Sequence, residues 1–382
     1  MRIAFAVHAY SPAVGGAERY AEGLAEAMAS IGHDVHVLAP NRRSAEAFYE
    51  YGHAEAGSAT EDLNGVTVHR ITLDAPRGGF LRSVPADGLI SESARFRLWN
   101  RYADALDKEV QRVAPDATIT LPHNFPNVGA ALRSTGRGVT AYAPLLHEED
   151  PAWQVDPIAA LIEQADVAVA LTAWEADRLV TTYGAAPRTT VVAPPGLAAP
   201  PLNKVAALDL DATYFVAVGR RSRSKNLTEI ARAVDILRAR GRDVRLVVVG
   251  PEADRSVDHD LMKYGDAVVL VGEVDEQAKW EYLRGARALV SMSLHESFGI
   301  AMVESWRMGR PVIARAIPMS SDLVNDGVDG YLVDGDESLI ARLDELLEDP
   351  ERASRMGAAG CETAMRYTWE SSARELLSAL VR

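Results

Sequence analysis

Two clusters of charged residues in this sequence have the composition and spacing of a site for a phosphorylated ligand. The first is "GRRSRSK", in which Gly219 ends a β-like run and three arginines and Lys225 follow closely. The second is "HESFGIAMVE", which carries Glu296 and Glu304. Guanidinium and ammonium groups bind phosphate oxygens, and carboxylates accept hydrogen bonds from hydroxyl groups. The alternative for each cluster is a solvated loop or an exposed helix rim with no ligand.

Glu296 is predicted to lie in a loop between a strand and a helix, and Glu304 inside that helix. The backbone N–H groups of Phe298, Gly299 and Ile300 then fall at the start of the helix. Such groups have no partner within the helix and favour an anion. We expect these amides to hold a diphosphate and the two glutamates to bind hydroxyl groups at the two ends of one ligand.

Among the four cations, Arg220 and Lys225 are the expected phosphate ligands, whereas Arg221 and Arg223 are expected to face water.

A third segment, "SPAVGGAERY", leads from the first strand into a helix and places Gly15 and Gly16 just before that helix. Glycines at a helix start let the backbone approach a ligand closely, although a flexible loop without a ligand has the same composition. The G-x-G-x-x-G turn of dinucleotide-binding proteins is absent here, which disfavours a nicotinamide-dependent oxidoreductase.

Short β-like runs alternate with amphipathic stretches along nearly the whole chain, which predicts an α/β fold with parallel sheets. The predicted strands are Ile3–Val7, Val35–Leu38, Thr67–Ile71, Ala117–Leu121, Val139–Ala143, Val167–Leu171, Tyr214–Val218, Arg245–Val249, Val268–Leu270, Ala288–Met292 and Pro311–Ala314. The clearest predicted helices cover residues 17–31, 91–113, 127–134, 173–183, 337–348, 351–366 and 369–381.

A proline-rich stretch without periodicity divides this pattern into two doubly wound domains. We predict an N-terminal domain at residues 1–195, a linker at 196–212, a C-terminal domain at 213–366 and a final helix at 367–382. Ligands of such folds bind at the carboxyl ends of the strands, so we expect the site in a central cleft.

Bulk composition excludes several classes of function. The net charge of −14 argues against nucleic acid and against a general affinity for anionic membranes. A single cysteine rules out a disulfide framework, and no apolar run is long enough to span a membrane. We expect a cytoplasmic protein with the alanine-rich, lysine-poor composition typical of GC-rich bacteria. Composition does not indicate the oligomeric state.

Taken together, the cation cluster after Gly219 and the pair Glu296 and Glu304 resemble the motifs of a known family. The combination of Gly219, Arg220 and Lys225 with the E-x(7)-E pair is similar to that of the retaining nucleotide-sugar glycosyltransferases of family four. "SPAVGGAERY", "VVAPPGL", "GVDGYLVDGD" and "YTWESSARELLSAL" extend the resemblance over nearly the whole chain. The resemblance implies the GT-B fold, in which two Rossmann-like domains face a cleft. It also implies that the domain at 1–195 binds the acceptor, that the domain at 213–366 binds the nucleotide sugar, and that the final helix at 367–382 crosses back to the first domain.

The resemblance also implies a role for each residue in the motifs. Arg220 and Lys225 would stabilise the departing diphosphate, Glu304 would hold the ribose, and Glu296 would hold the transferred sugar. His147 aligns with a histidine near the reacting sugar carbon. The remaining implied donor contacts are made by Gly15, Gly16, Gly219, Val274 in the base-binding loop, Phe298, Gly299 and Ile300.

The implied reaction is transfer of a sugar from a nucleoside diphosphate to a hydroxyl acceptor with retention of configuration, without a metal or a resident cofactor. His123 begins a loop after a strand and is a candidate for acceptor binding. The "HEED" segment at 147–150 has no second set of metal ligands at suitable spacing. An epimerase acting on nucleotide sugars and a non-catalytic sugar-nucleotide binder remain alternatives.

This chain departs from the family pattern at a few positions. Ser297 and Asn226 replace glycines, and "ARAIPMSSDLV" lacks two glycines that precede an acid in the family. The charged groups are retained, so these differences bear on the identity of the sugar rather than on the reaction.

Overall fold

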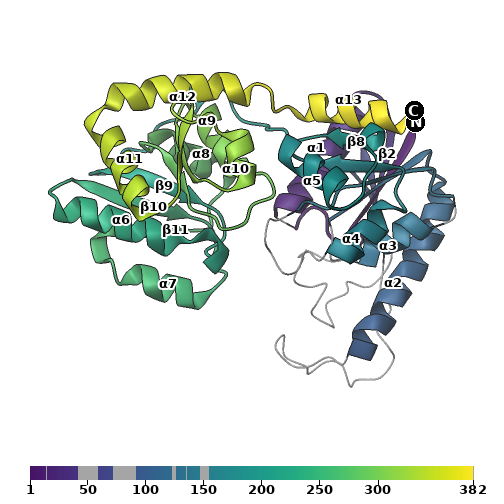
Figure 1. Ribbon diagram of the computed structural model, residues 1–382. Helices are drawn as coiled ribbons and strands as arrows, with labels where there is room; N and C mark the ends of the chain where they lie inside the picture. The colour runs from purple at the N-terminus through teal and green to yellow at the C-terminus, as the bar shows by residue number, and fades with distance from the viewer. Residues whose placement is uncertain are drawn as a thin grey trace. The chain divides into compact units, whose positions relative to one another are not determined.

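The computed structural model describes residues 1–13, 15–41, 59–71, 92–122, 126–134, 136–146 and 155–381. These residues form two compact units. Among the described residues, unit 1 comprises those up to Leu146, those from 155 to Gly196 and those from Trp369 onward, and unit 2 comprises Leu197–Thr368. Figure 1 shows the helices and strands of both units.

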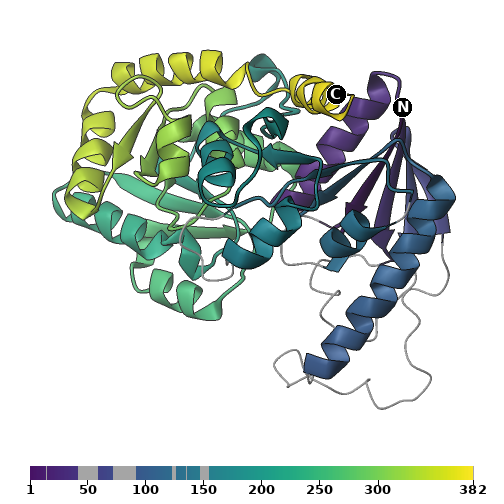
Figure 2. The ribbon, with the colours of Figure 1, turned by 45° about the vertical axis from the view of Figure 1, so that its right-hand side comes forward.

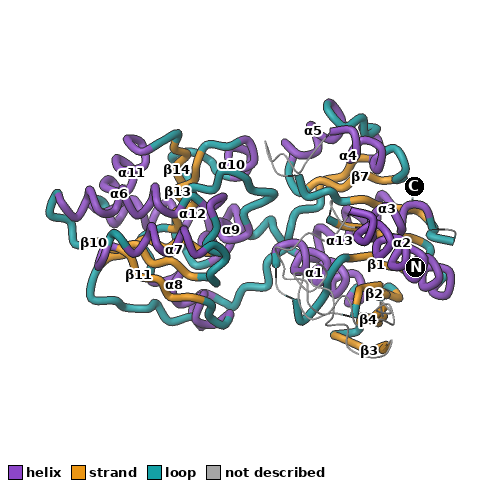
Figure 3. The backbone as a smooth tube through the Cα atoms, turned by 90° about the horizontal axis from the view of Figure 1, so that it is seen from below, coloured by secondary structure: helices purple, strands orange, loops and turns teal. Residues whose placement is uncertain are grey.

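Unit 1 is built on a sheet with the strand order β3-β4-β2-β1-β5-β6-β7-β8. All neighbouring strands are parallel except β3, which is antiparallel to β4. Figure 3 shows β3, β4, β2 and β1 side by side in this order. The strands are β1 (Arg2–Val7), β2 (Asp34–Pro40), β3 (Ala59–Leu63), β4 (Val66–Ile71), β5 (Ala117–Leu121), β6 (Val139–Tyr142), β7 (Val167–Ala170) and β8 (Thr190–Val192).

Helices cover both faces of this sheet because their apolar stripes match its buried, β-branched strands. One face carries α2 (Glu92–Val113), α3 (Pro126–Arg133), α4 (Val155–Ile162) and α5 (Ala173–Thr181). The long helix α2 runs beside the strands in Figure 2. The other face carries α1 (Gly16–Ser30) and the last helix of the chain, α13 (Trp369–Leu380).

Unit 2 has a second parallel sheet with the order β11-β10-β9-β12-β13-β14. Its strands are β9 (Thr213–Val218), β10 (Val244–Val249), β11 (Val268–Gly272), β12 (Leu289–Ser291), β13 (Val312–Arg315) and β14 (Gly330–Val333). Its helices are α6 (Leu227–Ala239), α7 (Arg255–Met262), α8 (Glu276–Gly285), α9 (Ile300–Arg307), α10 (Pro318–Leu323), α11 (Asp336–Glu348) and α12 (Pro350–Ala364).

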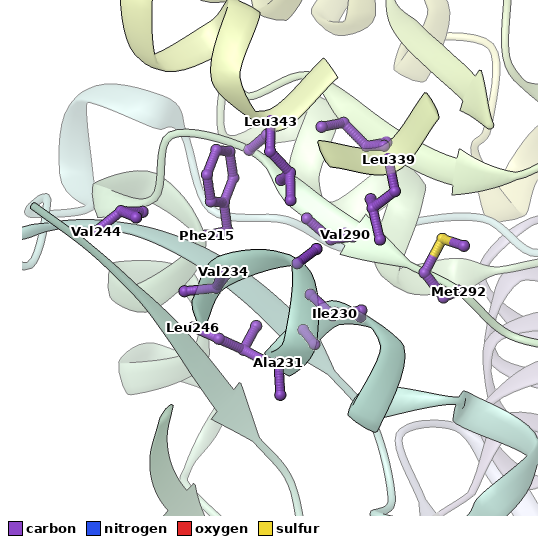
Figure 4. Close-up of a cluster of buried hydrophobic side chains, with 14 of the residues drawn as sticks. Phe215, Ile230, Ala231, Val234, Val244, Leu246, Val290, Met292, Leu339 and Leu343 are labelled. Atoms are coloured by element: carbon purple, nitrogen blue, oxygen red, sulfur yellow. The ribbon is translucent and has the colours of Figure 1, made fainter. Parts of the chain in front are cut away.

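The largest core described in unit 2 lies between the sheet and α6, with contributions from α7, α11 and α12. Figure 4 shows Phe215 of β9 and Leu246 of β10 beside Ile230 and Val234 of α6, with Leu343 of α11 nearby. Burying each such side chain contributes roughly 1.5–3 kcal/mol. The opposite face of the sheet packs against α8 and α9.

The fold class predicted from the sequence, two doubly wound parallel sheets with helices on both faces, is confirmed. Residues 197–212, predicted as a linker, cluster with unit 2, where the Leu208 N–H donates to the Glu281 carbonyl. Helix α13 packs on α1 of unit 1, and the Ser372 hydroxyl donates to the Pro194 carbonyl.

Several elements had no counterpart in the predicted pattern. These are the short strands β3, β8 and β14 and the helices α4 and α10. Strands β3 and β8 end the sheet of unit 1 on its two sides, and β14 is the last strand on one side of unit 2. The predicted parallel core is therefore extended at its edges.

Candidate functional site

The carboxyl ends of β9 and β12, neighbours in the sheet of unit 2, enclose a recess. It is lined by Ala217, Val218, Gly219, Lys225, Leu227, Leu289, Val290, Ser291, Ser293, Glu296, Gly299, Ala301 and Met302. Four residues predicted from the sequence thus lie in one place: Gly219, Lys225, Glu296 and Gly299. They come from two loops and converge because parallel strands end at the same edge of a sheet.

Gly219 follows β9 with a φ of +139°, a conformation that residues with a side chain rarely adopt. Its N–H donates to the Val249 carbonyl at the end of β10. A Cβ added at this position would lie 3.5 Å from Cε of Lys225, so the lysine stem passes directly over the glycine backbone. The glycine therefore turns the chain and leaves room for the lysine beside it.

The loop after Gly219 contains a short 3-10 turn over Arg223–Lys225 that presents the lysine to the recess. Asn226 ends this turn in the left-handed conformation, with φ 49° and ψ 39°, and opens helix α6. Asparagine tolerates this conformation better than other residues that carry a side chain. The replacement of the family's glycine by Asn226 is therefore compatible with the same backbone path.

Lys225 and Glu296 form an ion pair inside the recess, with Nζ 2.5 Å from Oε2. Both side chains are partly exposed, 27% for the lysine and 19% for the glutamate. The two loops are also joined through the backbone, since the Leu294 N–H donates to the Ser224 carbonyl at 2.8 Å. Because the pair is only partly buried, an incoming anion can compete with Glu296 for the lysine.

Helix α9 begins at Ile300, directly beside the recess. Its N-cap residue Gly299 has a φ of +78°, and Phe298 is buried and contacts the Tyr367 ring edge-on at 5.4 Å. Among the described residues, the N–H groups of Phe298, Gly299 and Ile300 donate no hydrogen bond. The start of α9 thus presents N–H groups without an acceptor beside the recess, as at the first turn of other helices.

Glu304 lies one turn further along α9 and is buried, with its side chain 4% exposed. Its Oε1 accepts from Nζ of Lys279, a buried lysine of helix α8, at 2.6 Å. Lys279 also donates to Glu276 at 2.8 Å and lies 4.7 Å from the ring centroid of Trp280. Glu304 does not line the recess, but Lys279 compensates its buried charge, which would otherwise cost several kcal/mol.

The three arginines of the loop have different environments. Arg220 is exposed and forms no side-chain hydrogen bond or ion pair with the described residues, so it is available to a ligand. Arg223 is 79% exposed and pairs with Asp254, as expected for a residue facing water.

The expectation that Arg221 faces water is wrong. Its guanidinium is buried and forms a bidentate pair with Asp258 of α7, at 2.6 and 2.8 Å. Hydrogen bonding to Asp258 raises the pKa of Arg221 further above its usual value. Arg221 is a structural residue that anchors the loop carrying Lys225 to α7.

The remaining predicted site residues are distributed over both units. Val274 follows β11 in unit 2 and is half-buried. In unit 1, Gly15 is the N-cap of α1 and Gly16 its first residue. His123 and His147 lie outside the described residues.

Two residues that contact the site, Lys279 and Asp258, could not be identified from any pattern in the sequence. Lys279 meets Glu304 because α8 packs on α9, and Asp258 meets Arg221 because α7 packs on the loop after β9. Neither pair is separated by a distance along the chain that a sequence motif would reveal. Ser291 and Ser293 also line the recess, and their position was predictable, because Ser291 lies near the end of the predicted strand and Ser293 directly follows it.

The described part of the chain contains neither a candidate metal site nor a candidate membrane-spanning helix. No group of three or more histidine, cysteine, aspartate or glutamate side chains there could hold a metal ion. Nor is any described helix both long and apolar enough to cross a membrane.

Comparison with solved structures defines the class of fold. Sucrose-phosphate synthase from Thermosynechococcus elongatus superposes with a TM-score of 0.77 at 19% identity, over 99% of this chain and 97% of that one. HepE from Anabaena, solved in complex with UDP and glucose, gives a TM-score of 0.73 at 15% identity, over 100% and 99% of the two chains. At such low sequence identity, these superpositions establish the fold alone, which is GT-B.

Comparison with protein families places the chain more narrowly. The model described as Glycosyltransferase Family 4 matches residues 14–198, and the model described as Glycosyl transferases group 1 matches residues 201–363. The chain therefore belongs to the family-4-like glycosyltransferases, and the resemblance inferred from its motifs is confirmed.

Curated relatives agree with this assignment. D-inositol 3-phosphate glycosyltransferase from Stackebrandtia nassauensis is 33% identical over 241 residues, which are 57% of this chain and 54% of the relative. The chain thus spans about half the length of this relative.

Proposed function

We propose that this protein transfers a sugar from a nucleoside-diphosphate donor to a hydroxyl group of an acceptor, with the recess of unit 2 as the donor site. The observation that carries the proposal is the convergence of Gly219, Lys225, Glu296 and the amides at the start of α9 on one sheet edge. An ammonium group and unpaired amides suit a diphosphate, and a neighbouring carboxylate suits sugar hydroxyls.

Binding of a diphosphate would rearrange the ion pair that already exists in the recess. Lys225 donates to Glu296, and a diphosphate placed against the α9 amides would compete for the same Nζ. Transfer of the lysine to phosphate releases the Glu296 carboxylate, which can then accept hydrogen bonds from the sugar. Arg220, exposed and without a partner among the described residues, adds a second positive charge.

Glu304 is proposed to accept hydrogen bonds from the ribose hydroxyls. Its ion pair with Lys279 favours the ionised carboxylate, the form that can accept from two hydroxyl groups. Val274, in the loop between β11 and α8, is proposed to contact the base.

In the proposed reaction, the bond between the anomeric carbon and the donor phosphate oxygen breaks while the acceptor oxygen bonds to that carbon. The acceptor proton passes to an oxygen of the departing diphosphate, and Arg220 and Lys225 stabilise the charge that develops there. Retention of configuration follows from attack on the same face as the leaving group. Because cations of the chain supply this stabilisation, the proposal requires no metal, and turnover should persist in EDTA.

The substrates can be ranked for testing. The solved structure of HepE contains UDP and glucose, so UDP-glucose is the first donor to test, followed by GDP-, ADP- and TDP-sugars. The relatives named D-inositol 3-phosphate glycosyltransferase make D-inositol 3-phosphate the first acceptor. If the donor is converted to an epimer without any acceptor, the reaction is epimerisation instead. Donor binding without turnover would indicate a non-catalytic binder.

Replacing Lys225 tests the phosphate assignment directly. Lys225→Ala should lower kcat/KM by about a hundredfold or more, the usual effect of removing one preorganised charge donor. The fold should be retained, because Glu296 is partly exposed and can be hydrated. The readouts are steady-state sugar transfer and circular dichroism.

Arg223→Gln is the matched control for this experiment, since Arg223 is a neighbouring cation that is largely exposed and does not line the recess. It should keep near-normal turnover. Full turnover by Lys225→Ala would refute the donor site.

A further inference from the structure

Unit 2 contains a second cluster of cations at the opposite edge of its sheet, where the strands begin. Arg287 and Arg310 each precede a strand by two residues, β12 and β13 respectively. Leu289 of β12 is in register with Val312 of β13, so the two arginines are neighbours across the strand pair.

Backbone contacts fix this arrangement. The Arg287 N–H donates to the Tyr214 carbonyl at 2.8 Å, which ties it to the start of β9. Nε of Arg310 donates to the Arg284 carbonyl at 2.7 Å, which ties it to the end of α8. Arg284 thereby becomes the third member of the cluster, hereafter the amino-edge arginines: Arg284, Arg287 and Arg310.

The charges of this cluster are not compensated within the described part of the chain. None of the three guanidinium groups has a carboxylate within 4.0 Å there, although the chain carries 54 acidic residues. Burial, followed by repulsion from Arg287 and Arg284, holds the pKa of Arg310 below its usual value, and burial also lowers that of Arg287. Nη1 of Arg284 is buried and has no hydrogen-bond partner.

Like charges that are partly buried and unpaired destabilise the fold unless an anion joins them. Guanidinium groups match the oxygens of a phosphate, with short charge-assisted hydrogen bonds. We propose that the amino-edge arginines form a binding site for a phosphate group, separate from the donor recess at the carboxyl edge of the same sheet. The phosphate belongs to a small phosphorylated molecule or to a lipid headgroup.

Calorimetric titration with inorganic phosphate tests the proposal. Because phosphate can also bind the donor recess, the titration is made in the Lys225→Ala background. The Lys225→Ala protein should bind phosphate at the amino-edge arginines. Adding Arg287→Gln or Arg310→Gln should each weaken this binding by roughly tenfold or more, the loss expected for one charge-assisted hydrogen bond. Arg255→Gln is the control, since Arg255 is 93% exposed on α7 of the same unit.

Two further measurements separate the possible outcomes. Sedimentation with phosphatidylcholine vesicles, with and without phosphatidic acid, distinguishes a lipid headgroup from a soluble phosphate, and either result supports the site if the arginine variants abolish it. In phosphate-free buffer, Arg287→Gln should melt no lower than the parent, because it removes repulsion.

The proposal is overturned if the protein binds neither phosphate nor the vesicles, or if neither arginine variant weakens the binding. It is also overturned if Arg287→Gln melts well below the parent. The last result would show that the guanidinium is already compensated within the fold. Failure of the donor site would leave these titrations unchanged, so the two proposals can fail independently.

Discussion

At the scale of single residues, the candidate donor site depends on charges that the fold keeps close to one another. Lys225 has Glu296 as its partner on the exposed side of the site, and Glu304 has Lys279 on the buried side. The first pair lines the recess and is partly exposed, whereas the second is buried where α8 packs on α9. The two pairs should therefore respond differently to substitution.

Lys279→Met should lower the free energy of unfolding by about 3–5 kcal/mol, because it leaves the carboxylate of Glu304 buried without its partner. The double variant Lys279→Met with Glu304→Met should recover most of that loss, since two apolar side chains replace two charges. Urea unfolding measures both. Lys263→Met is the control, because Lys263 is 61% exposed, and it should change stability by less than about 0.5 kcal/mol. Equal stability of Lys279→Met and the parent would contradict the assignment.

A second buried carboxylate, Glu175 of unit 1, should make stability depend on pH. It accepts hydrogen bonds from the N–H groups of Leu146 and Leu171, yet its complete burial raises its pKa from 4.5 to about 7. The folded chain then retains a proton that the unfolded chain loses above about pH 4.5. Stability from this group is present below that pH and is lost as the pH rises to about 7.

Glu175→Gln, which cannot titrate, isolates this effect. The free energy of unfolding of the parent should fall relative to that of the variant by up to roughly 3 kcal/mol between about pH 4.5 and pH 7. Parallel stability curves for the two proteins across this range would show that Glu175 titrates normally.

How far the site could be predicted follows from where each residue lies. Gly219, Lys225, Glu296 and Gly299 each follow a strand that periodicity identifies, and parallel strands bring their carboxyl ends to one edge. Lys279 and Asp258 could not be assigned, because their partners depend on which helices pack together. The packing of helices is a tertiary contact, and it produces no characteristic residue spacing by which the pairs could be recognised in the sequence.

At the scale of elements, two of the missed elements, β3 and α4, differ in how clearly the sequence indicates them. Strand β3 is polar and pairs antiparallel with β4 through a turn at Asn64 and Gly65, both with positive φ. An Asn-Gly pair between two runs is a strong hairpin signal, so this strand was predictable. Helix α4 contains Pro157 in its first turn, where proline is tolerated, and its proline obscured the helical pattern.

The packing of α13 on α1 depends on one glycine. A Cβ at Gly23 would lie 2.2 Å from the ring of Trp369, so the two helices touch at this point. In an ordinary helix, replacing glycine by alanine stabilises by roughly 0.5–1 kcal/mol. Here Gly23→Ala should instead destabilise by roughly 1–3 kcal/mol, because the helices must separate or the ring must move.

Urea unfolding of three variants measures this effect. Gly129→Ala on α3 is the control, since its added Cβ would meet only the mobile end of Arg133. Combining Gly23→Ala with Trp369→Leu should recover part of the loss. A stabilised Gly23→Ala would mean that α13 does not pack on this face.

At the scale of the whole molecule, the expected effect of a nucleotide depends on which unit holds the proposed donor site. The donor recess and the amino-edge arginines both belong to unit 2, at opposite edges of one sheet. Binding of a nucleotide should therefore slow hydrogen exchange mainly in unit 2.

Hydrogen exchange with and without UDP tests this expectation. At a concentration a hundred times its dissociation constant, UDP should slow exchange of the amides of residues 298–300 by up to about a hundredfold. The same protection should be absent in Lys225→Ala. Protection confined to unit 1 would place the nucleotide elsewhere.

The chain leaves unit 1 at Gly196 and completes it only with Trp369–Leu380, after the whole of unit 2. On the ribosome, the sheet of unit 1 therefore emerges first, but the part of it that α13 covers, around β6, β7 and β8, stays uncovered until that helix is synthesised. Unit 2, whose described residues form the single segment Leu197–Thr368, can fold in the meantime, since domains generally fold as units during translation. A nascent chain halted before residue 369 would thus carry a finished second half and an unfinished first half, and chaperones that recognise apolar surface should bind it there.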